Sequence, residues 1–232
     1  MDVPGRLGRA LEECGRLLQV ALDFTNPWDA LRVALQARAG RGVILEAGTP
    51  LIKSYGMGSV RLLRVLQGED GVVVADTKTM DTGRLELSLA AEAGADVATV
   101  LAVAPRETIR EMVEEGETRG VAVMGDLIGH PDPVRGAEEL YSLGVHVALF
   151  HIGIDVQRSL GLSAANRAEL VAKLAESFPG PIAVAGGIKP EEVGRLVEAG
   201  ARIIIIGGAI TRSPDPASAA MEAYRGLNAR CL

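Results

Sequence analysis

Eight short runs rich in valine, isoleucine, leucine and alanine recur along the chain, and segments with apolar residues at helical spacing separate them. The runs are nearly continuous in apolar residues, as strands must be when both faces of a parallel sheet are covered. This alternation in 232 residues predicts an α/β protein, a single-domain (β/α)8 TIM barrel over residues 1–232. The predicted strands are 17–24, 42–48, 71–78, 96–103, 121–129, 145–153, 181–187 and 201–208.

Three predicted helices end in closely similar sequences: EAGAD at 92–96, SLGVH at 142–146 and EAGAR at 198–202. In each, a glycine closes the helix and the next strand begins at once, which is typical of the tight turns at the N-terminal face of a barrel. No segment has the composition of a linker between two domains. Before the first strand, Leu7 and Leu11 have the spacing of a short amphipathic helix over about residues 5–16.

Composition excludes several classes of function. The formal net charge is −6 and no run of lysines or arginines is present, which argues against nucleic acid as a partner. No apolar stretch approaches the length of a membrane span, and the N-terminal segment mixes charged with apolar residues, so neither a membrane helix nor a signal peptide is predicted. Cys14 and Cys231 have no metal-binding spacing and predict no disulfide framework, so a reducing, cytoplasmic location is expected.

Polar residues gather at one end of the predicted strands. Active sites of (β/α)8 barrels lie at the C-terminal ends of the strands, whereas strands that merely run out into solvated loops would scatter their charges. Asp76 and Lys78 are two residues apart, so both can point into the barrel mouth. The candidate site residues at strand ends are Asp23, Glu46, Asp76, Lys78, Asp126 and His151, of which Asp23 and Asp126 are assigned to substrate binding.

Glu46 and Asp76 end neighbouring strands and are candidate metal ligands. A buried carboxylate is costly unless it is paired or metal-bound, and Glu46 taken alone is equally compatible with a structural pair to Lys53 or Lys78. Together the two carboxylates supply hard oxygen ligands of the kind that Mg²⁺ binds with water and substrate oxygens. Lys78 would then offer a fixed positive charge or a proton donor, held charged by its acidic neighbours.

The chain has three histidines, and their positions predict different roles. His146 lies early in its strand, where a packing role is expected. His130 precedes Pro-Asp-Pro in a predicted loop, where exposure to solvent is expected. His151 ends its strand at the barrel mouth, opposite the carboxylates, and is therefore the candidate acid or base at neutral pH.

Pairs of glycines end the last two strands, Gly186-Gly187 in AGGI and Gly207-Gly208 in GGAIT. Structural glycine at a strand-to-helix turn would explain one such pair. The loops after strands seven and eight of these barrels, however, often bind phosphate through bare backbone N–H groups. The two pairs therefore predict a phosphorylated substrate.

The stretch Asp76-Thr-Lys78-Thr-Met-Asp81 resembles the D-x-K-x-x-D signature of the orotidine 5'-phosphate decarboxylase suprafamily of barrels. Within the suprafamily, the chain is most similar to the hexulose-phosphate synthases. Six motifs in order carry the resemblance over about residues 17–212: ALDF, EAGTPLIKSYG, ADTKTMDTG, FHIGIDVQ, VAGGI and IIIGGAIT.

Smaller differences separate the members of the suprafamily. Orotidine and keto-gulonate-phosphate decarboxylases typically carry Gly-Arg after strand eight, where this chain has Gly207-Gly208. Keto-gulonate enzymes also carry a basic residue soon after the strand-six histidine, whereas this chain has His151-Ile-Gly-Ile-Asp155. Glu46 further disfavours orotidine decarboxylation, which is metal-free in that family. The stretch GDLIGHPDP, which contains His130, departs from the family pattern.

The resemblance implies a lyase that uses Mg²⁺ or Mn²⁺ to join formaldehyde reversibly to ribulose 5-phosphate through an enediolate. In that interpretation Lys78, His151 and Asp81 are catalytic, and Asp81 fixes Lys78 or the substrate. In the family this aspartate reaches into the neighbouring subunit's site, which implies a homodimer. A keto-gulonate-phosphate-type decarboxylase is the alternative, and a barrel that binds sugar phosphate without turnover is a remote one.

Overall fold

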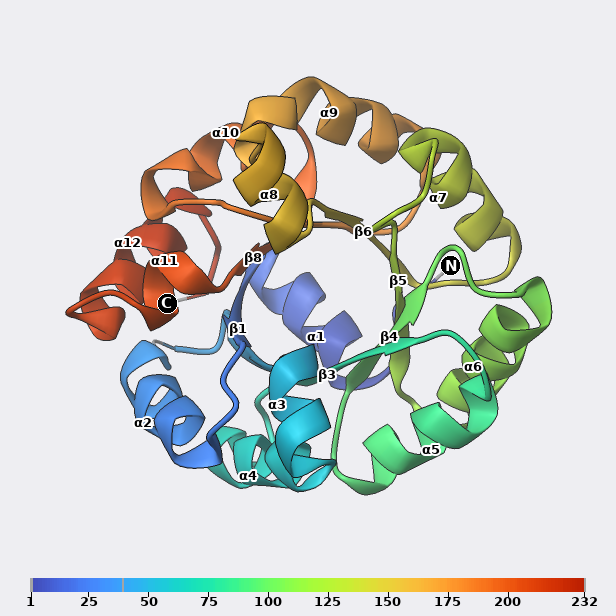
Figure 1. Cartoon of the computed structure of the whole chain (residues 1–232), viewed down its shortest axis with the longest axis horizontal. Coiled ribbons are helices and arrows are strands. Elements are labelled where there is room, and N and C mark those ends of the chain that lie inside the picture. Colours follow the sequence, from blue (N-terminus) through green and yellow to red (C-terminus); the bar gives the residue numbers. More distant parts are fainter. Residues whose placement is uncertain (1, 39, 232) are drawn as a thin grey trace.

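A closed barrel of eight parallel strands in sequential order forms the centre of the molecule (Figure 1). The computed structural model describes residues 2–38 and 40–231. The predicted TIM barrel is confirmed, and each predicted apolar run corresponds to one strand, although β3 extends one residue beyond its run, to Thr79. The strands are β1 (Leu17–Leu22), β2 (Val43–Ala47), β3 (Val73–Thr79), β4 (Val97–Leu101), β5 (Ala122–Asp126), β6 (Val147–His151), β7 (Ile182–Ala185) and β8 (Ala201–Ile206).

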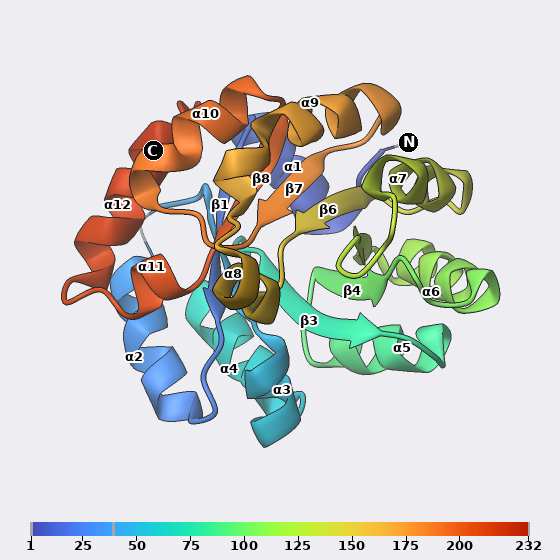
Figure 2. The ribbon, with the colours of Figure 1, turned by 45° about the horizontal axis from the view of Figure 1, so that its top comes forward.

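Helices surround the barrel in one ring, and three short helices lie at the C-terminal ends of strands (Figures 1 and 2). The ring consists of α2 (Pro27–Ala37), α4 (Gly58–Gln67), α5 (Gly83–Glu92), α6 (Arg106–Arg119), α7 (Pro133–Ser142), α9 (Ala168–Ser177), α10 (Val193–Glu198) and α12 (Pro216–Gly226). The short helices α3 (Thr49–Tyr55), α8 (Ile154–Leu160) and α11 (Gly208–Thr211) follow β2, β6 and β8 directly.

Local sequence explains where the helices begin and end. The side chains of Asn26 and Asp132 accept hydrogen bonds from the first turns of α2 and α7, and a proline follows each of them. The glycines of the three repeated helix ends have positive φ angles: 93° at Gly94, 86° at Gly144 and 103° at Gly200. Glycine adopts such angles without strain, so each helix stops there and the next strand begins within three residues.

Two apolar layers form the core. One lies between the strands and the outer helices, and the other fills the barrel interior. The N-terminal helix α1 (Gly5–Cys14) lies across the N-terminal end of the barrel, where Leu7, Leu11 and Cys14 are buried against that interior layer. The predicted N-terminal helix is therefore confirmed, and it closes the end that we call the barrel floor. The open end, at the C-terminal ends of the strands, is the barrel mouth.

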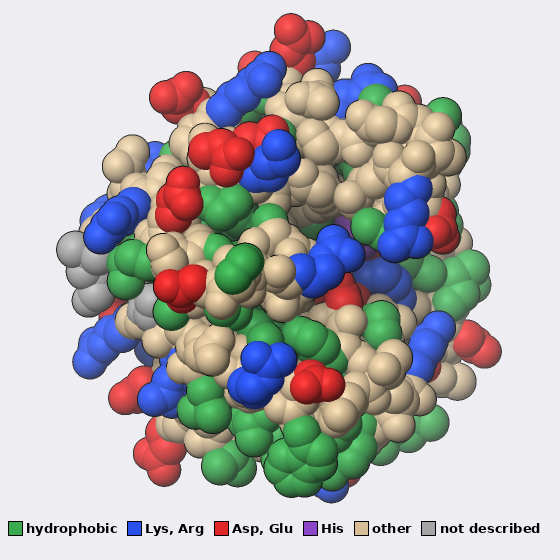
Figure 3. All heavy atoms as spheres, turned by 60° about the vertical axis from the view of Figure 1, so that its left-hand side comes forward, with side chains coloured by type: hydrophobic (Ala, Val, Ile, Leu, Met, Phe, Trp, Pro, Cys, Tyr) green, Lys and Arg blue, Asp and Glu red, His purple; other side chains and the backbone are tan. Residues whose placement is uncertain are grey.

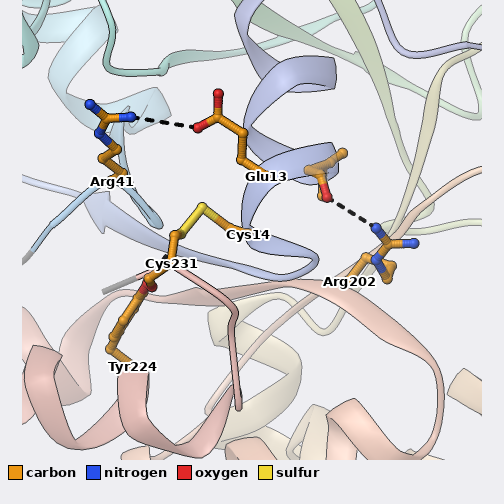
Figure 4. Close-up of a disulfide and its surroundings, with 7 residues drawn as sticks. Glu13, Cys14, Arg41, Arg202, Tyr224 and Cys231 are labelled. Carbon is orange, nitrogen blue, oxygen red and sulfur yellow. Dashed lines mark hydrogen bonds and ion pairs between the residues drawn. A yellow bond between two sulfur atoms is a disulfide. The ribbon is translucent and has the colours of Figure 1, made fainter.

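The expectation of no disulfide is wrong in this structure. Cys14 and Cys231 are joined by a disulfide, with 4.7 Å between their Cα atoms (Figure 4). The 217 residues between them concealed the pairing in the sequence, because the two chain ends meet only when α1 covers the floor and the chain returns after α12. The Tyr224 hydroxyl donates a hydrogen bond to the Cys231 carbonyl and fixes that return.

The ladder between β3 and β4 is irregular near the mouth. Its register shifts between Ala75 and Thr79, and Lys78 within the shifted segment has a φ angle of 47°. Such positive angles are uncommon for residues other than glycine and cost free energy. Irregularities of this kind re-aim side chains near active sites.

The outer surface carries interspersed charges. Acidic and basic side chains alternate over the face seen in Figure 3, without a large area of one sign. Within the described residues, no helix has both the length and the apolar character that crossing a membrane requires.

Candidate active site

Four candidate residues from three strands form one connected group at the barrel mouth. Asp76 and Lys78 project from β3, Asp126 from the end of β5 and His151 from the end of β6. Hydrogen bonds or ion pairs link them in the order Asp76, Lys78, Asp126, His151. Glu46 on β2 and Asp23 after β1 lie close enough for the charge of Asp76 to raise the pKa of both carboxyl groups.

Asp76 and Lys78 form the centre of the group. The Lys78 ammonium donates to both Asp76 carboxylate oxygens, at 2.8 and 2.7 Å, and its Nζ lies 3.3 Å from Asp126 Oδ2. Burial alone would lower the pKa of Lys78, but the carboxylates of Asp76 and Asp126 outweigh burial and raise it. Lys78 therefore stays positively charged at neutral pH.

Two threonine hydroxyl groups also donate hydrogen bonds to Asp76. The Thr49 hydroxyl donates to Asp76 Oδ2 at 2.7 Å, and the Thr99 hydroxyl donates to Asp76 Oδ1 at 2.9 Å. Asp76 itself is 5% exposed, and these hydroxyl groups together with Lys78 satisfy its buried oxygens. The sequence gives no signal for Thr99, because a single threonine within an apolar strand is ordinary.

Asp126 and His151 form a second pair. His151 Nδ1 lies 2.9 Å from Asp126 Oδ2, and the Ile128 N–H donates to Asp126 Oδ1 at 2.9 Å. Burial would raise the pKa of Asp126, but the hydrogen bond and charge of His151, followed by Lys78, lower it. An ionised Asp126 accepts the proton on Nδ1, so the second ring nitrogen, Nε2, is the one left to accept a proton.

Glu46 is buried beside a single neutral donor. Gln19 Nε2 on β1 donates to Glu46 Oε2 at 2.6 Å. Burial raises the pKa of Glu46 well above its usual range, and the charges of Asp76 and Asp23 raise it further. A polar glutamine inside the apolar run LLQVAL is a signal that sequence reasoning could have used but missed.

The oxygen atoms around Glu46 and Asp76 are suited to bind a divalent cation. Gln19 Oε1 is buried and lacks a hydrogen-bond partner among the described residues, which leaves an oxygen acceptor beside an undercompensated carboxylate. No group of three or more His, Cys, Asp or Glu side chains suited to a metal occurs in residues 2–38 and 40–231. Mg²⁺ requires no such group, because it keeps several waters and takes one or two carboxylates together with substrate oxygens.

Asp23 lies at the rim of the mouth and is exposed to solvent. Partial burial, followed by the charge of Asp76, raises its pKa. Its carboxylate fits against two glycines: a Cβ at Gly48 would lie 2.1 Å from Asp23 Oδ1, and a Cβ at Gly207 would lie 3.4 Å from Oδ2. Because Gly48 and Gly207 have no side chains, the Asp23 carboxylate has room between them.

The glycine pairs after β7 and β8 differ in how strictly their positions require glycine. Gly186 has a φ of 116°, and a Cβ there would lie 2.4 Å from the Ile152 carbonyl oxygen. A Cβ at Gly208 would lie 2.2 Å from Nη2 of Arg212, whose side chain folds back over the start of α11. Arg212 forms no ion pair within the described part of the chain, and sequence reasoning missed it.

Asp81 does not join the group at the mouth. It is exposed, and its Oδ1 accepts a hydrogen bond from the Thr82 N–H at 2.8 Å. It lines an outer cavity of about 520 Å³ between the starts of α5 and α6. His130, half-buried in its loop, accepts a hydrogen bond from the Asp132 N–H and has no contact with the group.

Comparison with known proteins identifies the family. The chain belongs to the orotidine 5'-phosphate decarboxylase / HUMPS family, whose model matches residues 16–223. A 3-hexulose-6-phosphate synthase of Mycobacterium gastri is 36% identical over 211 residues, which cover 88% of this chain and 96% of that protein. A bifunctional enzyme Fae/Hps of Methanococcoides burtonii is 37% identical and matches 91% of this chain. The chain covers only 53% of that relative, about half its length.

Solved structures agree with this assignment. A crystal structure of 3-hexulose-6-phosphate synthase superposes with a TM-score of 0.84 at 36% identity, covering 91% of this chain and 99% of that one. A 3-keto-L-gulonate-6-phosphate decarboxylase from Vibrio cholerae gives a TM-score of 0.80 at 25% identity, covering 92% of this chain and 97% of that one. The fold is thus shared by both enzymes, while the higher identity lies with the synthase.

Proposed function

We propose that the chain is an aldehyde-lyase that joins formaldehyde to ribulose 5-phosphate, and cleaves the product, in the manner of a 3-hexulose-6-phosphate synthase. The observation that carries the proposal is the linked group of Asp76, Lys78, Asp126 and His151 at the barrel mouth, which provides a fixed cation next to an oriented base. The similarity to named synthases at 36% identity supports the same substrate pair.

His151 is the proposed base. Asp126 accepts the Nδ1 proton, so Nε2 can take the proton from C1 of ribulose 5-phosphate. The electron pair left on C1 delocalises onto the neighbouring oxygen as an enediolate. C1 then forms a bond to the formaldehyde carbon, and the formaldehyde oxygen takes up a proton. In the cleavage direction the same groups act in reverse order.

Lys78, together with the cation held by Glu46 and Asp76, would stabilise the negative charge of the enediolate. The ammonium of Lys78 stays protonated because of Asp76 and Asp126, so it can donate to the oxyanion that forms next to C1. Glu46 and Asp76 are the proposed ligands of Mg²⁺ or Mn²⁺, which when bound would stabilise negative charge on the substrate oxygens. The partnerless Gln19 Oε1 beside Glu46 supports that assignment.

Substrate orientation is assigned to the rim. Gly186, Gly187, Gly207 and Gly208 present bare backbone at the ends of β7 and β8, where a phosphate can be bound by N–H groups. Arg212, folded over Gly208, adds a positive charge at this point. Asp23 is assigned to the substrate hydroxyl groups. Phosphate binding at the rim would place C1 over Lys78.

Two assays test the reaction. The purified chain with Mg²⁺ is incubated with ribulose 5-phosphate in D₂O, and exchange of the C1 proton is followed by NMR. Formaldehyde consumption and CO₂ release are then measured separately with the matching sugar phosphates. Exchange together with formaldehyde uptake is expected. Release of CO₂ from a keto-gulonate phosphate without formaldehyde uptake would instead assign the decarboxylase function, and tight binding without exchange would indicate a non-catalytic binder.

A homodimer with shared sites is also proposed. Asp81 is exposed and has no hydrogen bond or ion pair to its own Lys78 among the described residues, and exposed apolar side chains occur near it in the sequence: Met80 is 48% exposed, Leu85 58% and Leu89 44%. Such a surface is suited to contact with a second copy. Mixing Asp81→Asn chains with Lys78→Ala chains should restore about one working site per heterodimer, because one shared site then receives both intact residues. Verified heterodimers without activity would show that Asp81 serves its own subunit.

A further inference from the structure

The hydroxyl group of Thr99 connects the two central residues of the site. Thr99 lies on β4 and is 1% exposed. Its Oγ1 accepts a hydrogen bond from the Lys78 backbone N–H at 2.9 Å and donates to Asp76 Oδ1 at 2.9 Å. In addition, the Thr99 carbonyl accepts a hydrogen bond from the Thr77 hydroxyl at 2.7 Å. One residue of the neighbouring strand thus holds three consecutive residues of β3.

The Lys78 N–H needs this acceptor because the strand ladder is interrupted there. The register between β3 and β4 shifts between Ala75 and Thr79, and Lys78 adopts its φ of 47° inside the shift. A left-handed backbone at a lysine persists only where the surrounding structure holds it. The Thr99 hydroxyl replaces the missing ladder bond and satisfies a donor that would otherwise be partly buried without a partner.

We propose that Thr99 is a positioning residue, which sets the geometry of Asp76 and Lys78 relative to one another without touching the substrate. Its donor side orients the Asp76 carboxylate that Lys78 contacts, and its acceptor side holds the Lys78 backbone in the conformation that directs the ammonium between Asp76 and Asp126. The proposal rests on the proposed function only for its kinetic consequence. The structural consequence is independent of substrate.

Substitution of Thr99 by valine and by serine separates the effect of its hydroxyl group from the effect of its side-chain shape. Thr99→Val keeps the volume but removes both hydrogen bonds, whereas Thr99→Ser keeps the hydroxyl and loses a methyl group. Thr79→Val is the matched control. Thr79 is also 1% exposed on β3, but its hydroxyl forms hydrogen bonds with Thr77 Oγ1 and Glu86 and none with Asp76 or Lys78.

The experiment compares these variants in two measurements. Amide hydrogen exchange at Lys78, followed by NMR without substrate, should accelerate at least about 10-fold in Thr99→Val and remain near wild type in Thr99→Ser and Thr79→Val. In the assay, Thr99→Val should lower kcat by about 100-fold with KM changed less than about threefold, because a misplacement of about 1 Å at a catalytic group costs this much. Thr99→Ser should rescue most of kcat.

The possible results distinguish the positioning role of Thr99 from the proposed function of the protein. Unchanged Lys78 exchange in Thr99→Val, or a loss of kcat equal to that of Thr79→Val, would overturn the positioning role even in an active enzyme. Accelerated exchange in a wild-type chain that proves inactive on every sugar phosphate would uphold the positioning role and reject the proposed function. If Thr99→Val does not fold, Thr99→Ala gives the same comparison with less steric demand.

Discussion

The floor and the mouth of the barrel are two ends of the same eight strands, yet the floor buries mainly apolar side chains and the mouth buries charged ones. At the floor, α1 packs Leu7, Leu11 and Cys14 against the barrel interior, and a disulfide joins the chain ends. At the mouth, buried carboxylates, an ammonium and an irregular strand meet within hydrogen-bonding distance. The floor gains free energy from apolar burial, whereas the mouth keeps polar groups that are costly to bury and that we propose take part in the reaction.

Two histidines of one βα unit make the contrast concrete. His146, just before β6, is 3% exposed, and its Nδ1 accepts a hydrogen bond from the Val123 N–H at 3.0 Å. Burial lowers its pKa to about 4, so it stays neutral and packs, as the sequence position predicted. His151, at the other end of the strand, faces a carboxylate instead. The two histidines therefore differ in environment according to their place along the strand, and only His151 lies at the end where active sites of such barrels occur.

The largest expected effect lies at the floor. Reduction of the disulfide, or Cys14→Ser, should lower the free energy of unfolding by about 5 kcal/mol, because the closed loop is very long. The melting temperature should fall by about 10 °C. Activity should stay within about twofold of wild type, since the disulfide lies at the opposite end of the strands. Thermal denaturation with and without a thiol reductant measures the first effect.

The thiol content of the purified chain is the control for this comparison. Free thiols in chain prepared without reductant, with no response of the melting temperature to reductant, would contradict the disulfide. That result would agree with the reducing, cytoplasmic location expected from the sequence, which stays a prediction.

The next largest effect is expected at the mouth, where substitution of Glu46 should reduce activity without reducing stability. Glu46→Gln should reduce kcat/KM by about 10³-fold, or about 4 kcal/mol, if Glu46 holds the proposed cation. Stability without metal should be unchanged or higher, because burial and the charges of Asp76 and Asp23 raise the pKa of the native carboxyl, which shows that its ionised form is disfavoured there. Mg²⁺ should raise the melting temperature of the wild type only. A similar Mg²⁺ response in Glu46→Gln would remove Glu46 from the ligand set.

The floor and mouth also differed in how far sequence could predict them. Charged residues at strand ends stand out against apolar runs, so Glu46, Asp76, Lys78 and His151 were identifiable, as was the fold. The role of Thr99 depends on the strained backbone of Lys78, which no residue pattern displays. Likewise, the disulfide depends on two chain ends meeting at the floor, and Arg212 depends on a side chain folding back across one helical turn. These contacts arise from tertiary structure alone.

A smaller effect should appear at the floor on acidification. The folded pKa of His146, about 4, lies below the value near 6.5 expected when the chain unfolds, so the unfolded state binds more protons. Stability should therefore fall as pH drops from about 6.5 to 4, by about 3 kcal/mol from this residue. Urea unfolding at several pH values measures it, with His146→Asn as the variant that cannot titrate. Equal pH slopes for both proteins would show that His146 is not the source.

The smallest expected effect concerns the phosphate end of the mouth. Arg212 folds over Gly208 and forms no ion pair within the described residues, so its charge is available to a substrate phosphate. Arg212→Ala should raise KM for the phosphorylated substrate about 10-fold, or about 1.4 kcal/mol, with kcat little changed. Inorganic phosphate should inhibit this variant more weakly by a similar factor.

Two further variants sharpen this last test. Gly208→Ala should weaken phosphate binding in the same direction, because its Cβ would lie 2.2 Å from Arg212 Nη2 and would displace the guanidinium. Arg225→Ala removes another exposed arginine, from α12 in the same part of the chain, and serves as the charge control. If Arg225→Ala raises KM as much as Arg212→Ala does, then the effect comes from the overall field of the protein. A selective effect at Arg212 and Gly208 would place the phosphate at the end of β8.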